Sequence, residues 1–265
     1  MFDLSGVGYS RTDIKDKRIV PKFMSEELAE LVGCHVGDGC INKNKSSIEI
    51  TYSGSHEDLN HHTEFIKKAF KNLFNYDAKI IFPTEREVST KVYSKAASSF
   101  FINVIGLVIG HKSKMQGIPK VIMNSNKEIK CAFLRGLADT DFSLCFKKND
   151  HGVYREPWIG TQLSNRNIIS DASLILDQIN ISNCMLLDLQ NFDKRVNKTR
   201  VSHYIQICGS RNLEKWMNFI GFHNMKHLSK YLLYVKKGYC NPKTTLDYRL
   251  KELGLRRKSL SHVLN

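Results

Sequence analysis

Two aspartates stand at matching places in two similar stretches of this sequence, LAELVGCHVGDG at residues 28–39 and FLRGLADTDF at residues 133–142. Asp38 and Asp141 are 103 residues apart, and each closes an apolar, helix-patterned segment. Hard divalent ions such as Mg²⁺ bind one or two carboxylates together with water and phosphate oxygens. The two aspartates are therefore the first candidates for metal ligands.

Small residues recur along the two stretches at every fourth position, which places them on one face of a helix. The offset of 103 residues pairs Ala29 with Ala132, Gly33 with Gly136, and Gly37 with Thr140. Glycine within a helix costs about 1 kcal/mol relative to alanine, and small residues spaced by four let two helix backbones approach closely. Incidental glycines in ordinary core helices are the alternative, which two copies in one register disfavour. The pattern predicts two parallel helices packed side by side.

Such packing would bring Asp38 and Asp141 to one end, where both helix dipoles are negative. Two carboxylates there repel each other unless one takes a proton or a cation lies between them. The chain is also strongly basic, with 40 Lys and Arg against 26 Asp and Glu and a net charge of +14. This balance favours a polyanionic partner, because phosphate contacts release condensed counterions. Together these features predict metal-assisted hydrolysis of phosphodiesters.

After each motif helix the hydrophobic pattern predicts a similar order of elements. The first half is expected to form strands at 46–52, 78–83 and 87–93 and helices near 57–74 and 96–105. The second half is expected to form strands at 144–147, 158–163, 184–190 and 200–207 and helices at 168–179 and 213–220. The expected fold class is α+β, with two pseudo-symmetric αββαββα repeats. Their motif helices would pack at the central interface, and two curved antiparallel sheets would form a DNA-binding saddle.

This order divides the chain into four expected parts. They are an N-terminal extension (1–24), a first repeat (25–125), a second repeat (126–242) and a basic, helical C-terminal tail (243–265).

Two further segments have similar sequences, IGLVIGHKSK at residues 105–114 and IGFHNMKHLSK at residues 220–230. Both end in a lysine after a His-x-Ser sequence. Lys114 and Lys230 are therefore candidate catalytic residues that would contact a phosphate or an activated water, with Lys112 as an alternative to Lys114.

The expected strands and their loops carry basic and polar side chains, which could read DNA in the major groove because Arg and Lys pair with guanine and Gln with adenine. A solvated sheet face is the alternative. The candidates for DNA binding are Lys43, Lys45, Arg86, Lys91, Lys147, Lys148, Arg155, Gln162, Arg195, Lys198 and Arg200.

LVGCHVGDG (31–39) and LRGLADTDF (134–142), with the matching elements around them, resemble the LAGLIDADG homing endonuclease family over residues 25–238. The resemblance implies that Asp38 and Asp141 bind Mg²⁺, for which Mn²⁺ would substitute. It implies a monomer that binds a long, asymmetric site in double-stranded DNA and cleaves both strands across the minor groove, leaving staggered ends. Gln162 and Ser164 fall where the family places residues that organise water.

The sequence departs from the family pattern at three places. Val36 replaces the first acid of the first motif copy, and Arg135 is bulkier than the small residue that is usual there. Phe142 replaces the final glycine of the second copy, which predicts that the chain leaves that helix without a left-handed residue.

Two other functions use the same scaffold. One is an RNA-binding intron maturase, whose partner would be intron RNA, and the other is a DNA-binding protein without catalysis. The chain begins with Met and ends in HVLN, without a splicing-type terminus, so a free-standing, intron-encoded protein is expected. The expected location is intracellular, in the cytoplasm or in an organelle.

Other features of the sequence carry less chemistry. No signal peptide, membrane span or nucleotide-binding loop is expected. The seven cysteines contain no CxxC pair, which favours reduced thiols. HHTEF at residues 61–65 lacks the spacing of a helical zinc site and is predicted to be a partly exposed helix face.

Overall fold

The computed structural model of the chain describes residues 1–43, 48–193 and 197–255. Two predicted DNA-binding residues, Lys45 and Arg195, lie outside these ranges, as does the tail beyond residue 255. Within the described ranges, no helix is both long and apolar enough to cross a bilayer.

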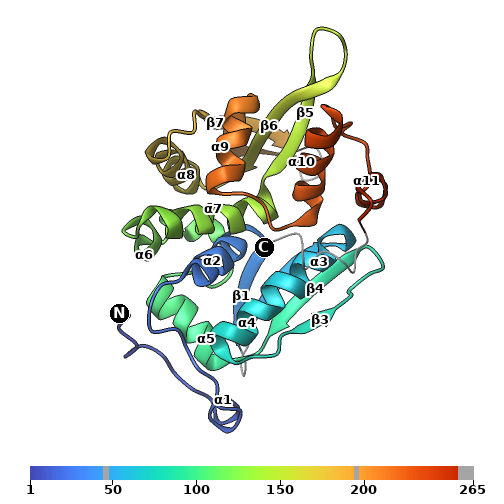
Figure 1. Cartoon of the computed structure of the whole chain (residues 1–265). Coiled ribbons are helices and arrows are strands. Elements are labelled where there is room, and N and C mark those ends of the chain that lie inside the picture. Colours follow the sequence, from blue (N-terminus) through green and yellow to red (C-terminus); the bar gives the residue numbers. More distant parts are fainter. Residues whose placement is uncertain (44–47, 194–196, 256–265) are drawn as a thin grey trace.

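The chain folds into two halves, each with a four-stranded antiparallel sheet, and the motif helices lie between them (Figure 1). The first sheet has the order β1-β2-β4-β3 and the second the order β5-β6-β8-β7. The strands are β1 (Gly39–Lys43), β2 (Ile48–Ser55), β3 (Lys79–Ile81), β4 (Glu87–Val92), β5 (Ser143–Lys148), β6 (Tyr154–Leu163), β7 (Cys184–Asp193) and β8 (Lys198–Cys208). The matching orders confirm the predicted α+β fold with two pseudo-symmetric repeats.

Helices cover one face of each sheet and connect the two halves (Figure 1). The α-helices are α1 (Arg11–Lys15), α2 (Glu26–Asp38), α3 (Leu59–His61), α4 (Lys67–Phe74), α5 (Lys95–Phe100), α6 (Lys120–Met123), α7 (Lys127–Asp141), α8 (Arg166–Gln178), α9 (Ser210–Phe219), α10 (Met225–Lys237) and α11 (Leu246–Leu253). Short 3₁₀ helices are η1 (His56–Asp58) and η4 (Lys112–Lys114), and π-helical turns are η2 (His62–Ile66) and η3 (Phe101–Ile105).

The second sheet has one buried and one open face. Side chains alternate between the two faces of a strand, so Ile205 and Ile207 of β8 are buried beneath helices α8 and α9. Tyr204 and Gln206, between and beside them, point to the opposite face, which the helices leave open. This open face is the surface on which a ligand of the sheet would bind.

The motif helices α2 and α7 pack with their backbones in direct contact, because glycine removes the side chains between them. A Cβ atom built on Gly136 would lie 1.9 Å from the backbone oxygen of Glu30, and one on Gly33 would lie 2.1 Å from that of Phe133. Residue numbers rise in the same direction along both sides of this contact, so the helices are parallel, as predicted. A Cβ on Gly37 would lie 1.8 Å from Oγ1 of Thr140.

The helix ends are alike even though their sequences differ. Gly39 has φ −80° and Phe142 has φ −87°, so neither copy uses a left-handed residue. Gly39 is required for a different reason, since a Cβ there would lie 2.4 Å from Nδ1 of His35. Phe142 instead fills space against Trp216, with ring centroids 5.9 Å apart. The replacement of glycine by Phe142 therefore leaves the geometry of this helix end unchanged.

The two segments of similar sequence adopt different structures. Lys114 ends the short 3₁₀ helix η4, whereas Lys230 lies in the middle of α10. The described part of the tail forms α11, which packs against α10 (Figure 1). Its Arg249 is 1% exposed and donates hydrogen bonds to Ser229 Oγ (2.9 Å) and to the backbone oxygen of Lys226 (3.3 Å).

The contact between α2 and α7 predicts the sign of one stability change. Glycine to alanine within a free helix stabilises it by about 1 kcal/mol. At Gly136 the added Cβ would overlap backbone atoms, so Gly136→Ala should lower the free energy of unfolding by about 1–3 kcal/mol or more. Denaturant unfolding measures this change, and a stabilised variant would contradict the close approach of the two helices.

Candidate active site

Asp38 and Asp141 meet at the C-terminal ends of α2 and α7, as the sequence predicts. A Cβ atom on Gly37 would lie only 3.5 Å from Cγ of Asp141, which shows how near the second carboxyl group lies to the first helix. Burial, followed by the charge of Asp141, raises the pKa of Asp38 to about 7. Burial likewise raises the pKa of Asp141. Both carboxyl groups are thus poised to take up a proton or a cation.

The lysines whose charges act on these carboxyl groups are Lys112 and Lys226. Lys112 opposes the rise in pKa of both aspartates, and Lys226 opposes that of Asp38. Of the two lysines predicted from sequence, Lys114 is exposed. Lys230 donates a hydrogen bond to the backbone oxygen of Leu144 at 3.0 Å. Lys112, the alternative to Lys114, is therefore better placed than Lys114 to act on the two aspartates.

A hollow of about 550 Å³ opens beside Asp38. Its lining carries both signs of charge and several hydroxyl groups, from residues of both halves. The polar members are Asp38, Ser53, Ser55, Asp58, Arg86, Glu87, Ser89, Thr140 and Lys226. Phosphate oxygens and water could both bind in such a mixed lining, and Arg86 is the predicted DNA-binding residue that it includes.

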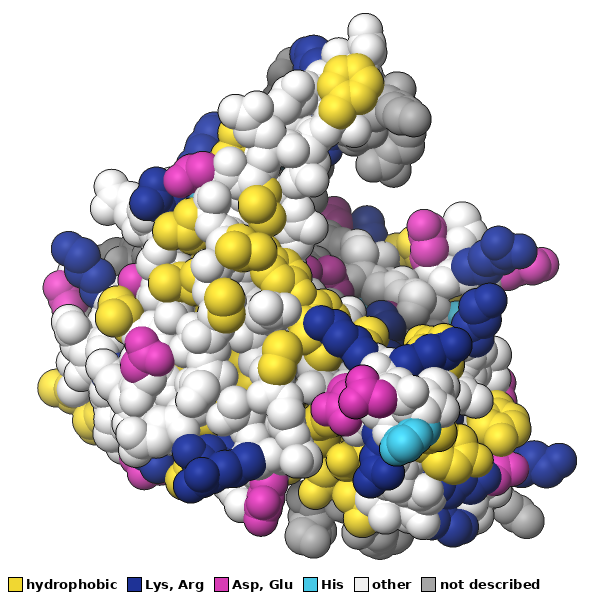
Figure 2. All heavy atoms as spheres, turned by 90° about the horizontal axis from the view of Figure 1, so that it is seen from above, with side chains coloured by type: hydrophobic (Ala, Val, Ile, Leu, Met, Phe, Trp, Pro, Cys, Tyr) yellow, Lys and Arg dark blue, Asp and Glu magenta, His cyan; other side chains and the backbone are white. Residues whose placement is uncertain are grey.

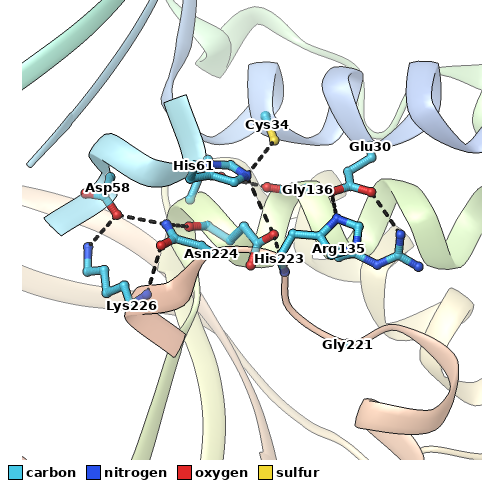
Figure 3. Close-up of polar contacts among 12 residues, drawn as sticks. Glu30, Cys34, Asp58, His61, Arg135, Gly136, Gly221, His223, Asn224 and Lys226 are labelled. Atoms are coloured by element: carbon cyan, nitrogen blue, oxygen red, sulfur yellow. Dashed lines mark hydrogen bonds and ion pairs between the residues drawn. The ribbon is translucent and has the colours of Figure 1, made fainter. Parts of the chain in front are cut away.

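Asp58 is another carboxylate in this hollow, and its contacts connect the two halves (Figure 3). Its Oδ1 accepts a hydrogen bond from Asn224 Nδ2 at 2.8 Å and lies 3.5 Å from Lys226 Nζ. Burial opposes ionisation, but Lys226 and the hydrogen bonds from Ser55 and Asn224 hold the pKa of Asp58 below its usual value. Asp58 is therefore charged, and it fixes Lys226 in place beside Asp38.

A second, buried polar cluster lies along the motif helices (Figure 3). Glu30 on α2 accepts hydrogen bonds from Arg135 on α7 (2.9 Å) and from His223 (2.6 Å). Burial works against charge on His223, but its hydrogen bond to Glu30 raises its pKa. This cluster ties the loop after α9 to both motif helices.

Asp139 belongs to the same cluster, but only one of its two carboxyl oxygens has a hydrogen-bond partner. Its Oδ2 accepts the backbone N–H of His223 at 3.0 Å, while its Oδ1 is buried without a hydrogen-bond partner. Burial, followed by the charge of Glu30, raises the pKa of Asp139 to about 7. Glu30, His61 and Asp139 have ligand atoms within 4.8 Å of one another. Both oxygens of Glu30 already bind cationic groups, Arg135 and His223, so we assign the cluster a structural role.

The prediction of a partly exposed helix face at residues 61–65 is wrong for both histidines. His61 and His62 are each 2% exposed. Burial lowers the pKa of His61 to about 3, so the imidazole whose Nε2 lies 3.7 Å from Asp139 Oδ2 is uncharged. His62 Nδ1 lies 2.7 Å from Thr90 Oγ1.

The predicted DNA-binding residues in the described ranges lie on the sheets and their loops, but their surroundings differ. Lys91 forms an ion pair with Glu49 at 2.8 Å across the first sheet. Lys147 lies over the ring of Trp158 at 5.7 Å, on the open face of the second sheet. Gln162 Nε2 donates to Ser202 Oγ at 2.6 Å on that same face. The remaining members are exposed at the ends of strands or in turns: Lys43, Arg86, Lys148, Arg155, Lys198 and Arg200.

The space-filling view from above shows how such charges are distributed (Figure 2). The surface is hollowed beside a projecting arm, and Lys and Arg side chains gather on the body next to it. A band of hydrophobic side chains crosses the middle of the same face. A polyanion could therefore contact this face along one side.

Sequence reasoning missed Asp58, Lys226 and the buried cluster around Glu30. Asp58 lies in a SHED sequence that contains the pattern of a helix N-terminal capping box. That signal places its side chain at a helix start, but not beside a partner 166 residues away. Lys226 lies four residues before the predicted Lys230, one helical turn closer to the helix N-terminus.

The raised pKa of Asp38 predicts how stability depends on pH. The carboxyl group is more acidic in the unfolded chain, so the free energy of unfolding falls as the pH rises from about 4 to about 7. In a chelator at pH 8, Asp38→Asn should therefore be more stable than the wild type, by about 1–3 kcal/mol. Urea unfolding measures the difference. Asp150→Asn, at an exposed position, removes the same charge and should show no such gain.

The chain is similar in sequence to parts of several known proteins. No family model matches the chain. It is 28% identical over 234 residues to a replication factor C small subunit of Methanocaldococcus jannaschii, covering 84% of this chain and 11% of that protein. Across the curated proteins that it resembles, the chain spans between 10% and 64% of their length.

Solved structures resemble most of the chain. The homing endonuclease I-DmoI in complex with DNA and Ca is 19% identical, with a TM-score of 0.50, covering 74% of this chain and 88% of that one. A variant of I-SmaMI is 13% identical, with a TM-score of 0.51, covering 88% of this chain and 98% of that one. The paired motif helices and the two sheets of matching order agree with these neighbours. This chain has the two-repeat fold of the LAGLIDADG homing endonucleases.

Proposed function

We propose that this protein is a LAGLIDADG homing endonuclease that cuts both strands of a specific site in DNA with a divalent metal ion. The observation that carries the proposal is the meeting of two half-buried carboxyl groups, Asp38 and Asp141, at the ends of parallel helices whose backbones touch. Two four-stranded sheets flank this point, and the chain carries a net charge of +14. DNA is the polyanion that such paired, extended surfaces would bind.

The residues at the helix ends fit a hard divalent cation. Asp38 and Asp141 offer carboxylate oxygens, and the raised pKa of Asp38 indicates that a positive charge is favoured there. These two aspartates would hold Mg²⁺, or Mn²⁺ in its place. When bound, such an ion lowers the pKa of water and stabilises charge on a phosphate. The neighbouring I-DmoI, crystallised with DNA and Ca, supports this assignment.

Other side chains of the hollow would act on the DNA directly. Lys226, fixed by Asp58, and Lys112 carry positive charge beside the aspartates and would bind the scissile phosphates. Ser53 and Ser55 offer hydroxyl groups that would orient water. Lys114 and Lys230, which the sequence predicts to be catalytic, stay candidates. Lys230 would act indirectly, because its hydrogen bond to the backbone oxygen of Leu144 holds β5 in place.

The proposal also covers the oligomeric state, the DNA target and the genetic setting of the protein. One chain with two unlike halves would act as a monomer on an asymmetric site. A monomer of this kind would bind a long, asymmetric duplex through Lys43, Arg86, Lys147, Lys148, Arg155, Lys198 and Arg200, with Lys91 and Gln162 on the sheets. It would leave staggered ends. The matches to 10–12% of three longer proteins support a unit that can lie inside a larger protein, while an intron-encoded, free-standing protein stays the expectation from sequence. Its substrate would place it in a DNA-containing compartment.

Cleavage of a randomised duplex library in Mg²⁺ tests the function. We expect specific double-strand cuts, which Asp38→Asn and Asp141→Asn should each slow on the order of 10³-fold, because metal stabilisation of charge is worth several kcal/mol. Both variants should still bind the selected site. Asp150→Asn, which removes an exposed carboxylate, should cut normally.

Binding and splicing assays separate the alternative functions from DNA cleavage. Enrichment of bound DNA without cutting, in both Mg²⁺ and Mn²⁺, would overturn the nuclease and leave a binding protein. Binding of intron RNA with promotion of splicing, in place of DNA cutting, would establish a maturase.

A pair of lysine variants tests which cation serves the site. Lys112→Met should reduce the cleavage rate by at least about tenfold, as loss of a charge-assisted hydrogen bond does. Lys114→Met, two residues away and exposed, should change it little. The reverse order would restore Lys114 as the catalytic lysine. Equal binding by both variants in Ca²⁺ would show that the loss lies in the reaction itself.

A further inference from the structure

Three side chains on the open face of the second sheet form a connected polar group. Trp158 Nε1 donates a hydrogen bond to Gln206 Oε1 at 3.0 Å, and the Tyr204 hydroxyl donates to the same oxygen at 3.3 Å. The rings of Trp158 and Tyr204 are stacked, with centroids 6.0 Å apart and planes 23° from parallel. Two rigid rings therefore hold the amide of Gln206 on the strand beside them.

The chemistry of the indole fixes which way this amide faces. A Trp Nε1–H group is only a donor, so the amide atom that it contacts must be the oxygen. Turning the amide over would set two donors against each other. The carbonyl oxygen of Gln206 is thus occupied by two donors, while among the described residues none accepts a hydrogen bond from its Nε2. Gln206 presents a donor without an acceptor.

The register of the sheet leaves this donor accessible. Gln206 pairs with Gly160 of β6 on one side and with Cys184 of β7 on the other. The indole of Trp158 lies over Gly160, with Cζ2 3.0 Å from where a Cβ would be, while on the other side the small side chain of Cys184 is exposed and leaves room. Within the described part of the chain no helix covers this face, since Ile205 and Ile207 point to the helical side. A base edge could therefore reach the Nε2 group.

We propose that Gln206 selects guanine at one position of the DNA target, with Trp158 and Tyr204 as the residues that orient it. This inference rests on the proposed function and names part of its sequence preference. Glutamine ordinarily pairs with adenine through both its oxygen and its nitrogen. With its oxygen occupied, Gln206 has nothing to accept the N6 amino group of adenine. Guanine offers two acceptors, O6 and N7, and thymine offers one, O4, whereas cytosine offers the N4 donor, which would oppose Nε2.

Selection of bound sequences from a randomised duplex library in Ca²⁺ tests the inference with the full-length protein. The wild type should prefer guanine about tenfold or more over cytosine at one position. In Gln206→Glu, one carboxylate oxygen can still accept from Trp158 and Tyr204, and the other presents an acceptor. That variant should shift the same position from guanine to cytosine. Gln178→Glu, on α8 at the covered side of the sheet, makes the same chemical change and should shift nothing.

A second variant tests the orienting role of the rings. Trp158→Phe keeps a stacked ring but removes the N–H group, so the amide of Gln206 can turn over. Adenine should then be accepted at that position as well as guanine, while the rest of the selected site stays the same. A site unchanged in Trp158→Phe would overturn the orienting role.

The outcomes separate this inference from the proposed function. If the wild type enriches no sequence, the proposed function fails. If it enriches a site but prefers adenine at the position that Gln206→Glu alters, or if no position changes, the inference fails alone. Alkylation of Cys184 by N-ethylmaleimide gives an independent readout, because DNA on this face should slow it at least severalfold. An unprotected Cys184 in a protein that binds DNA would also overturn the inference.

Discussion

The direct contact between the backbones of α2 and α7 determines where the candidate active site lies. Glycines 33 and 136 bring the helices so close that a Cβ atom would overlap a backbone oxygen. Because the helices are parallel, their C-terminal ends coincide and carry Asp38 and Asp141 with them. Burial and mutual repulsion at this point raise the pKa of Asp38 to about 7. The close packing of the helices therefore also accounts for the raised pKa of Asp38.

Buried charges between the two halves are compensated within the protein. Glu30 is balanced by Arg135 and His223, and Asp58 by Lys226. These pairs join α2 or η1 of the first half to α7, α10 or the loop between α9 and α10 in the second. Removing one partner of such a buried pair is more costly than the pair is stabilising, because the other charge stays desolvated. The network therefore fixes the relative position of the halves more than it adds to stability.

The sequence predicted the parts of the fold that depend on local pattern. Repeated glycines, alternating strands and the two aspartates at matching places were visible because each is periodic or duplicated. Lys114 and Lys230 show the limit of that reasoning, since similar sequences fold into a 3₁₀ turn in one half and an α-helix in the other. His61, His62 and Glu30 look like surface residues, and only the tertiary fold buries them. Gln206 could not be singled out, because its orientation depends on Trp158 from another strand.

The contact between Gly37 and Thr140 makes the halves complementary and no longer interchangeable. Thr140 fits because the opposite helix has no side chain at Gly37. Two copies of the second half would set threonine against threonine with no space for either, and two copies of the first would leave a void at the same place. A change of size at one of the two positions therefore requires a matching change at the other, so the two halves cannot vary independently at this contact.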